Sequence, residues 1–439
     1  MIAHIPFKKL IFHRVAKNTY WLLGDYLLRL LLGIIVFVLS ARIFGPERFG
    51  MLNYALSFIT LFLPLAGLGL DRIIVRDLVR EQKKQNEILF TSFCMRFLSG
   101  SVMIVLSLVL ISFLKPGDST MLSIVGIFSS LLLFQAFDIF DYWFQSVIQS
   151  RTVVLVKAGI FIIFAFGKSL SLIIFPSLIV YVLLSAIESG LYGIGLLSAY
   201  LKINGKIPWN FNLLWAWKMM RQSYPLFLSG LFVIISMKIG QIIIGQVVSE
   251  RQLGIYSAAT RISETTYIII TATTASVFPL FAQLRKTSRL KYYTWLQTFF
   301  DFSGGTALAI SLSITLLAYP IIKVLFGIQY EESIQILQIH IWSTIPVFLS
   351  TTQGIWNINE GYTHIHLFQA FGTTVCTIAS LILFLPRFGI VSVAWISVLS
   401  PFISMVVINL LNTESRKILR YQLQSLFVLK HLGLFIRHI

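Results

Sequence analysis

Long apolar stretches alternate with short polar segments along the whole chain. Most of the apolar stretches exceed the ~20 residues that a helix needs to cross about 30 Å of hydrocarbon. The alternation predicts an all-α, polytopic membrane protein with twelve transmembrane helices joined by short connections. The predicted spans are residues 19–40, 50–70, 88–113, 121–146, 152–173, 177–200, 223–247, 254–281, 296–318, 333–358, 364–385 and 389–411.

A weak internal repeat divides this pattern into two halves. FGPERFGMLNYA (44–55) follows the first span, and VSERQLGIYSAA (248–259) follows the seventh. Because six spans return the chain to the same side of the membrane, the halves are predicted to be parallel, pseudo-symmetric six-helix lobes around a central cavity. The alternative is that short glycine turns resemble one another by chance. The predicted parts are an N-terminal lobe (1–206), a C-terminal lobe (207–411) and a cytoplasmic amphipathic tail (412–439).

Composition and charge placement agree with a membrane protein. The chain is 57% hydrophobic and 12% charged, with a mean hydropathy of +0.84, which no soluble domain of this length shows. Of its 35 lysine and arginine residues, 24 lie in segments predicted to be inside, 7 outside and 4 within spans. This bias predicts that both termini are cytoplasmic. It also explains the net charge of +18 without a nucleic-acid partner.

Signatures of catalysis are missing from the sequence. It contains no glycine-rich nucleotide loop, no metal-ligand spacing and no Ser-His-Asp arrangement, so we expect no enzyme activity, no catalytic residues, no metal and no cofactor. Cys94 and Cys376 lie in apolar segments and are predicted to be inert thiols. If the chain moves a solute across the membrane, a proton or sodium gradient is the candidate energy source.

Charged side chains inside the predicted spans are the main candidates for binding. Arg29, Lys238 and Arg261 lie deep in spans 1, 7 and 8. Such charges are costly in lipid, so they should face protein or a water-filled cavity. Asp25 lies four residues before Arg29, and Glu264 three residues after Arg261, so each carboxylate shares a helix face with its arginine. The alternative is that these are self-neutralising pairs that only fix helix packing.

Two stripes of polar side chains follow helical spacing in spans 4 and 10. Amides, carboxylates and aromatic rings on one face suit the hydroxyls and C–H faces of sugars, although such residues also bond helix to helix. The predicted sugar-contacting residues are Gln135, Asp138, Tyr142 and Gln145 in span 4, and Gln353 and Asn357 in span 10. Arg96 is predicted to lie near a membrane interface and is not included in the site.

Eight segments in chain order resemble the Wzx-type O-antigen flippases, the polysaccharide branch of the superfamily that includes multidrug MATE exporters and lipid II flippases. The segments are ARIFGPERFGMLNYALSF (41–58), GLGLDRIIVRDL (67–78), FDYWFQS (140–146), YPLFLSG (224–230), GQVVSERQLGIYSAATRISE (245–264), VFPLF (277–281), LFGIQYEESIQIL (325–337) and PRFGIVSVAW (386–395). The resemblance implies alternating access of two lobes and a polyprenyl-pyrophosphate-linked oligosaccharide as substrate.

The resemblance also bears on the charged residues. Related lipid II flippases place cavity arginines in their first and eighth helices, which implies that Arg29 and Arg261, together with Lys238, bind the pyrophosphate. Relatives commonly have an aspartate in span 7, where this chain has Gly240. Ion coupling would then fall to other carboxylates. The candidates are Asp25, Glu188 and Glu264.

The predicted function is therefore a flippase for an undecaprenyl-pyrophosphate-linked repeat unit of O-antigen or a related glycan. Its expected partners are this substrate, membrane lipids, and a polysaccharide polymerase and chain-length proteins as further candidates. A MATE-like ion-coupled exporter is the alternative, but it would need a cavity dominated by carboxylates. A membrane polymerase or ligase would need a long outer loop, and a scaffold role would leave the charges inside the spans unexplained.

Overall fold

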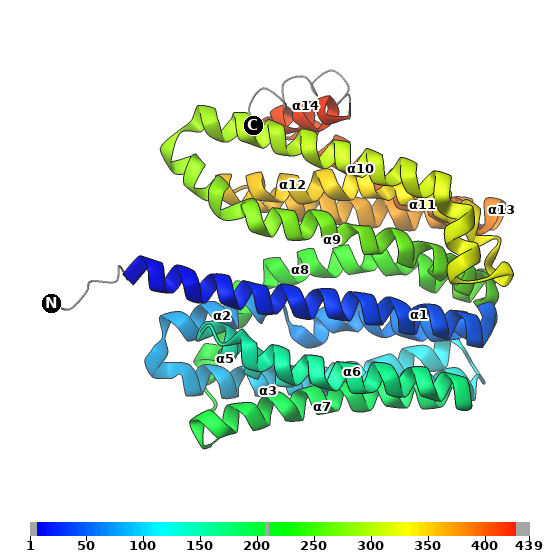
Figure 1. The fold of residues 1–439 in the computed structure, drawn as a ribbon, viewed down its shortest axis with the longest axis horizontal. Helices are drawn as coiled ribbons and strands as arrows, with labels where there is room; N and C mark the ends of the chain where they lie inside the picture. Colours follow the sequence, from blue (N-terminus) through cyan, green and yellow to red (C-terminus); the bar gives the residue numbers. More distant parts are fainter. Residues whose placement is uncertain (1–6, 207–209, 427–439) are drawn as a thin grey trace. The chain divides into compact units, whose positions relative to one another are not determined.

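The computed structural model describes residues 7–206 and 210–426, and within these ranges all regular structure is helical (Figure 1). Nine helical segments of the described chain are long and apolar enough to cross a membrane. The predicted all-α polytopic fold is confirmed. Two of the nine segments are kinked and contain two predicted spans each, so the nine contain eleven of the twelve predicted spans. The twelfth, 333–358, is built from two shorter helices and is not among the nine.

The kinks lie at glycines. Helix α1 (Phe7–Gly67) contains Gly45 at φ 69°, and the predicted spans 19–40 and 50–70 lie on either side of it. Glycine adopts positive φ without a steric penalty, and Pro46, the next residue, suits the first position of a new helix. Helix α13 (Thr363–Leu411) contains Gly389 at φ 62°, between the predicted spans 364–385 and 389–411.

The remaining predicted span, 333–358, is formed by two consecutive helices. Helix α11 (Ser333–His340) and helix α12 (Thr344–Glu360) are joined by the 3-10 turn η5 (Ile341–Ser343). Helix α12 ends at Glu360, and the next residue, Gly361, has the left-handed conformation typical of a residue that follows a helix.

The chain divides into two compact units, Met1–Leu231 and Phe232–Ile439, here called the N-terminal and C-terminal units. The division falls within helix α8 (Leu213–Ile243). The lobe boundary predicted at residues 206/207 stays a prediction.

In the N-terminal unit, α1 packs against α3, α4 and α6, and α7 packs against α4 and α6 (Figure 1). The helices that follow α1 are α2 (Asp71–Arg80), α3 (Gln85–Leu114), α4 (Ser119–Phe134), α5 (Asp138–Ser146), α6 (Ser150–Ile174) and α7 (Leu178–Asn204), with 3-10 turns η1 (Gln82–Lys84) and η2 (Gln135–Phe137). Trp143 and Phe144 of α5 and Trp215 of α8 share a buried apolar core, so the first turns of α8 belong to this unit.

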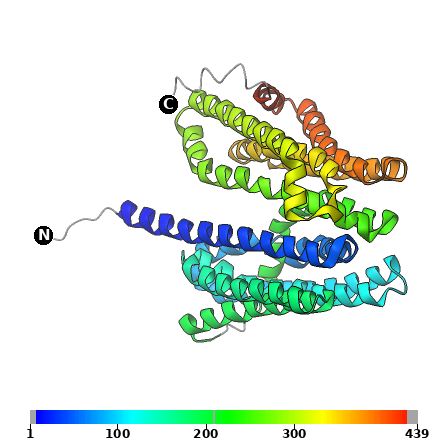
Figure 2. The ribbon, with the colours of Figure 1, turned by 45° about the vertical axis from the view of Figure 1, so that its right-hand side comes forward.

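In the C-terminal unit, α9 packs against α11 and α12, and α10 packs against α11, α12 and α14 (Figure 2). Its further elements are the π-helical segment η3 (Ile244–Val248), α9 (Glu250–Thr287), α10 (Arg289–Leu325), the 3-10 turn η4 (Ile328–Tyr330) and α14 (Arg416–Ser425). Phe281, Phe300 and Trp356 are fully or almost fully buried in its core, which gives this unit an apolar interior of its own.

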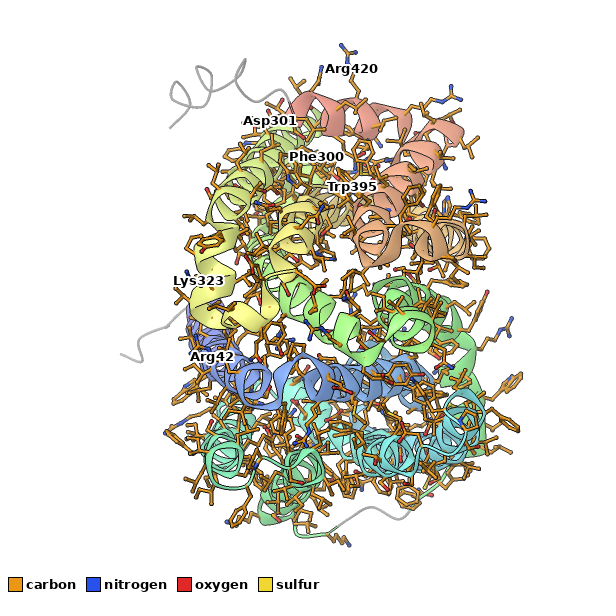
Figure 3. All side chains as sticks on the ribbon, turned by 90° about the vertical axis from the view of Figure 1, so that its right-hand side faces the viewer. Arg42, Phe300, Asp301, Lys323, Trp395 and Arg420 are labelled. Atoms are coloured by element: carbon orange, nitrogen blue, oxygen red, sulfur yellow. The ribbon has the colours of Figure 1, made fainter. Side chains whose placement is uncertain are left out.

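Helix α14 is the described part of the predicted amphipathic tail. It buries Ile418 and Gln422, and a Cβ on Gly304 of α10 would lie only 2.8 Å from Ser425, so the two helices approach closely. Arg420 is exposed on the other side of α14 (Figure 3). One face of α14 therefore packs on protein and the other carries charge. Residues 427–439 of the predicted tail lie outside the described residues.

Candidate functional site

A chain of ionisable side chains crosses the N-terminal unit, and it begins at Arg29. The Arg29 Nε donates to both carboxylate oxygens of Asp25, at 2.9 and 3.0 Å. Its Nη1 donates to the Tyr192 hydroxyl of α7 at 3.2 Å, and its guanidinium lies over the rings of Phe161 and Tyr192. The Nη2 atom is buried and has no hydrogen-bond partner among the described residues. One nitrogen of this arginine is therefore left without a hydrogen bond to the described residues.

The chain continues to a second ion pair. The Tyr192 hydroxyl donates to Glu188 Oε1, and Lys168 of α6 donates to Glu188 Oε2 at 2.5 Å. The side chains of Lys168 and Glu188 are only 12% and 8% exposed. Two cations and two carboxylates thus neutralise each other through one tyrosine, across α1, α6 and α7. Sequence spacing pointed to Asp25 and Arg29 but gave no signal for Lys168 or Tyr192, which lie more than a hundred residues away.

The N-terminal unit contains a second buried charge. Arg96 of α3 is 1% exposed, and its predicted place near a membrane interface stays a prediction. Its Nη1 lies 3.2 Å from Asp71 Oδ1, and its guanidinium lies over the Tyr142 ring. The Tyr142 hydroxyl donates to the same Asp71 oxygen at 2.8 Å. A carboxylate at the start of α2 is thereby held by two side chains from other helices.

The polar stripe predicted in span 4 spreads over α5 and the preceding turn. In the orientation of its amide that satisfies both neighbours, Gln135 donates to the Leu63 carbonyl at 3.2 Å and accepts from Arg96 Nη2 at 3.3 Å. Gln145 donates to Asp141 at 3.0 Å, and Asp141 accepts from Lys157 at 2.6 Å. Asp138 lies within electrostatic range of both Arg96 and Lys157. These contacts favour the packing alternative; a role in sugar binding stays a prediction.

In the C-terminal unit, Lys238 of α8 pairs with Glu264 of α9. Their nearest atoms, Nζ and Oε1, are 3.5 Å apart, and each side chain is 20% exposed. The sequence instead suggested a pair within α9 between Arg261 and Glu264. Arg261 lies on an exposed side of α9. The Lys238 contact joins two helices, and at this distance it is weaker than the 2.7–2.9 Å bonds of close charged pairs.

Glu264 also lines a cavity of about 260 Å³ inside the C-terminal unit. The cavity is bounded by α8, α9, α11, α12 and α13 together with η5. His340 of α11 and His366 of α13 line it as well, and the His340 Nδ1 lies 2.6 Å from the Ser263 hydroxyl. None of the predicted sugar-contacting residues lines this cavity.

The two predicted residues of span 10 are buried elsewhere in the same unit. Gln353 exchanges hydrogen bonds with Asn409 at 2.8 and 3.0 Å and accepts from Gln422 of α14 at 2.9 Å. Gln369 of α13 donates to both Gln353 and Asn409. Asn357 is 1% exposed, and neither atom of its amide has a hydrogen-bond partner among the described residues. Gln353 thus belongs to a closed amide cluster that holds α12, α13 and α14 together.

Across the described residues, no group of three His, Cys, Asp or Glu side chains is placed to hold a metal ion. The arrangement provides something else: cations inside apolar helices, each held by a carboxylate at a partly exposed position. An anionic ligand can compete with a carboxylate for such a cation. Binding of an anion by these cations stays a prediction.

The fold is that of multi-pass membrane transporters of the MOP superfamily. The lipid II flippase MurJ in an inward closed conformation matches with a TM-score of 0.74 at 16% identity, covering 95% of this chain and 93% of that one. An inward-facing multidrug resistance MATE transporter matches with a TM-score of 0.63 at 13% identity, covering 93% and 96%. A MOP transporter from Pyrococcus furiosus, described by the reverse polarity of its binding pocket, matches at 0.62 and 12%, covering 94% and 96%. At such identities the likeness establishes the fold alone.

The sequence identifies the family. Residues 15–285, more than half of the chain, match the model of the polysaccharide biosynthesis protein family, and the chain belongs to that family. No curated protein matches the sequence significantly. Family and fold together make this a multi-pass membrane protein of the polysaccharide biosynthesis family with the fold that MurJ and the MATE transporters share.

Proposed function

We propose that this protein moves an undecaprenyl-pyrophosphate-linked oligosaccharide repeat unit, of O-antigen or a related surface polysaccharide, across the bacterial inner membrane by alternating access. The observation that carries the proposal is the pair of membrane-embedded cations, Arg29 and Lys238, each held by one carboxylate and each still partly exposed. Membership of the polysaccharide biosynthesis family supports it.

The physics of the substrate explains why cations are needed. A pyrophosphate carries about two negative charges, and removing an unpaired anion from water costs many kcal/mol. Arginine offers a planar set of donors to phosphate oxygens, whereas lysine offers a compact point charge. We assign the pyrophosphate to Arg29, Lys238 and Arg261. The lipid tail would stay in the bilayer while the polar headgroup crosses.

Other parts of the proposal concern energy, orientation and partners. Asp25, Glu188 and Glu264 are the candidates for coupling to a proton or sodium gradient, because a carboxylate beside a cation can exchange that cation for another. Both termini are assigned to the cytoplasm from the charge bias. A polysaccharide polymerase and chain-length proteins are the proposed partners on the far side of the membrane.

Ion-coupled export of a small molecule is the competing function, since multidrug MATE transporters share the fold. Purified protein in liposomes separates the two. Flipping of a fluorescent lipid-linked sugar, without uptake of cationic dyes, is the expected result. Dye uptake driven by an ion gradient without any flipping would replace our proposal with the exporter, and glycan elongation would replace it with a polymerase.

A further inference from the structure

The cavity in the C-terminal unit has the size and lining of a site for one sugar ring. Its volume of about 260 Å³ lies below the ~300 Å³ at which pockets begin to hold drug-sized ligands, so it admits a single ring rather than an oligosaccharide. Val233, Met237 and Pro401 supply apolar surface, and Ser236, Thr351 and Thr373 supply hydroxyls. Alternating C–H faces and hydroxyl groups are what a sugar presents.

We propose that this cavity binds the sugar ring of a glycosyl phosphate, and that the attached phosphate binds Lys238 at its edge. The inference rests on the proposed function, because it assigns a part of the same lipid-linked substrate to a site. Met237 lines the cavity and Lys238 follows it in α8, while Glu264, the partner of Lys238, lines the cavity itself.

The hydroxyls of the lining are oriented to accept. The Ser236 hydroxyl donates to the Val233 carbonyl at 2.8 Å, and the Thr351 hydroxyl donates to the Val347 carbonyl at 2.8 Å. Each hydroxyl has one hydrogen and donates it to a carbonyl of its own helix, so its lone pairs remain free to accept hydrogen bonds. Sugar hydroxyls are donors and fit such acceptors.

His340 adds a polar ring to the lining. It is only 5% exposed, and its Nδ1 lies 2.6 Å from the Ser263 hydroxyl, a contact that fixes the ring against α9. In a neutral imidazole one ring nitrogen donates and the other accepts, so with Nδ1 bonded to Ser263 the other nitrogen is left for a ring hydroxyl of a sugar.

The Lys238–Glu264 pair provides the exchange that admits a phosphate. At 3.5 Å the pair is at the outer limit of a hydrogen bond, so little is lost when Lys238 turns to a stronger acceptor. Glu264 would not be left without a partner, since a sugar hydroxyl in the cavity can donate to it. Ring and phosphate would therefore bind together better than either alone.

Protection of an engineered thiol tests this inference. Cys94 and Cys376 are replaced by alanine, and Thr373→Cys reports on the cavity; Thr294→Cys, exposed on α10, is the control. The probes are the 1-phosphates of glucose, galactose and N-acetylglucosamine, the three free sugars, and inorganic pyrophosphate. We expect at least one sugar 1-phosphate to slow labelling of Cys at 373 about fivefold or more, with weaker effects of free sugar or pyrophosphate and none at 294. Lys238→Met should remove the protection, and Lys238→Arg should retain part of it.

Each other outcome counts against the inference. Protection by pyrophosphate alone would remove the sugar from the site, and protection that survives Lys238→Met would remove the phosphate. Absence of protection by any probe would overturn the inference. Flipping is measured on wild-type protein in the same preparation: flipping without protection refutes only this subsite, whereas absence of flipping refutes the proposed function.

Discussion

Replacement of Arg29 by alanine is the sharpest test of the N-terminal ion network. Arg29 donates from Nε to Asp25 and from Nη1 to Tyr192, and its buried Nη2 has no partner among the described residues. If Nη2 receives a phosphate oxygen, the variant loses at least one hydrogen bond to a charged group. Such a bond contributes about 1.5–3 kcal/mol, which corresponds to a roughly 10- to 150-fold loss of transport.

The same substitution also affects stability, and the two effects must be separated. Asp25 is 17% exposed and would lose its charged partner, which should cost on the order of 1–3 kcal/mol of unfolding free energy. Arg29→Lys keeps the charge but loses the planar set of donors, so we expect partial recovery of transport. The measurement is flipping in liposomes, and surface glycan display in cells, at matched protein levels with thermal unfolding of each variant.

The double variant Asp25→Ala with Arg29→Ala distinguishes binding from packing. A self-neutralising pair that only fixes helix packing can be removed as a unit, because no unpaired charge is left behind. A pyrophosphate ligand cannot be replaced in this way. We therefore expect the double variant to fold and to remain inactive. Transport restored by the double variant would refute the assignment of Arg29 to the pyrophosphate.

Three further predictions concern topology, sugar contact and energy. Reporter fusions at Lys115 and Glu331 should score as periplasmic and a fusion at Lys286 as cytoplasmic; a cytoplasmic score at Glu331 would contradict the map of the second half. Cysteines at Asp138 and Tyr142 should be protected from an impermeant thiol reagent by substrate, and inert cysteines at both positions would leave the packing role alone. Flipping should accelerate in a proton or sodium gradient and lose this response in Glu264→Gln; equal rates with and without gradients would rule out ion coupling.

The hydropathy pattern was enough to predict the fold because a transmembrane helix makes all its backbone hydrogen bonds within one segment. Length and hydropathy were therefore enough to predict the apolar helices, nine of which within the described residues could cross a membrane, and spacing within one helix was enough to bring Asp25 to Arg29. Contacts between different helices could not be predicted from hydropathy or from spacing within one helix. Tyr192 and Glu188 complete the Arg29 network from α7, and Arg96 is buried by groups from three other elements. Nothing in the spacing of these residues indicates which helix faces meet.

The stripe in span 10 shows a related limit of sequence spacing. Helical spacing places Gln353 and Asn357 on one face, but it does not say whether that face meets a ligand or another helix. In the structure the face of Gln353 meets α13 and α14, and the amides bond one another. Part of the cavity lining does follow helical spacing, since α13 contributes His366, Gln369, Ala370, Thr373 and Thr377 to it. The other lining residues come from α8, α9, α11, α12 and η5, and spacing within one helix does not show that these elements meet.

Gly240 marks a close contact between α8 and α13. The family resemblance leads one to expect an aspartate at this position of span 7. Here a Cβ on Gly240 would lie 3.0 Å from Val393 Cγ1 of α13, tighter than nine in ten real Cβ contacts, so a larger side chain would require Val393 to shift by a few tenths of an ångström. Residues two apart on a helix point to different faces, so an aspartate at 240 would not lie beside Lys238, and the carboxylate partner of Lys238 is Glu264 of α9. Gly240→Asp should therefore lower the thermal stability through the α8–α13 contact without offering Lys238 a second carboxylate; wild-type stability of this variant would show that Val393 can shift without cost.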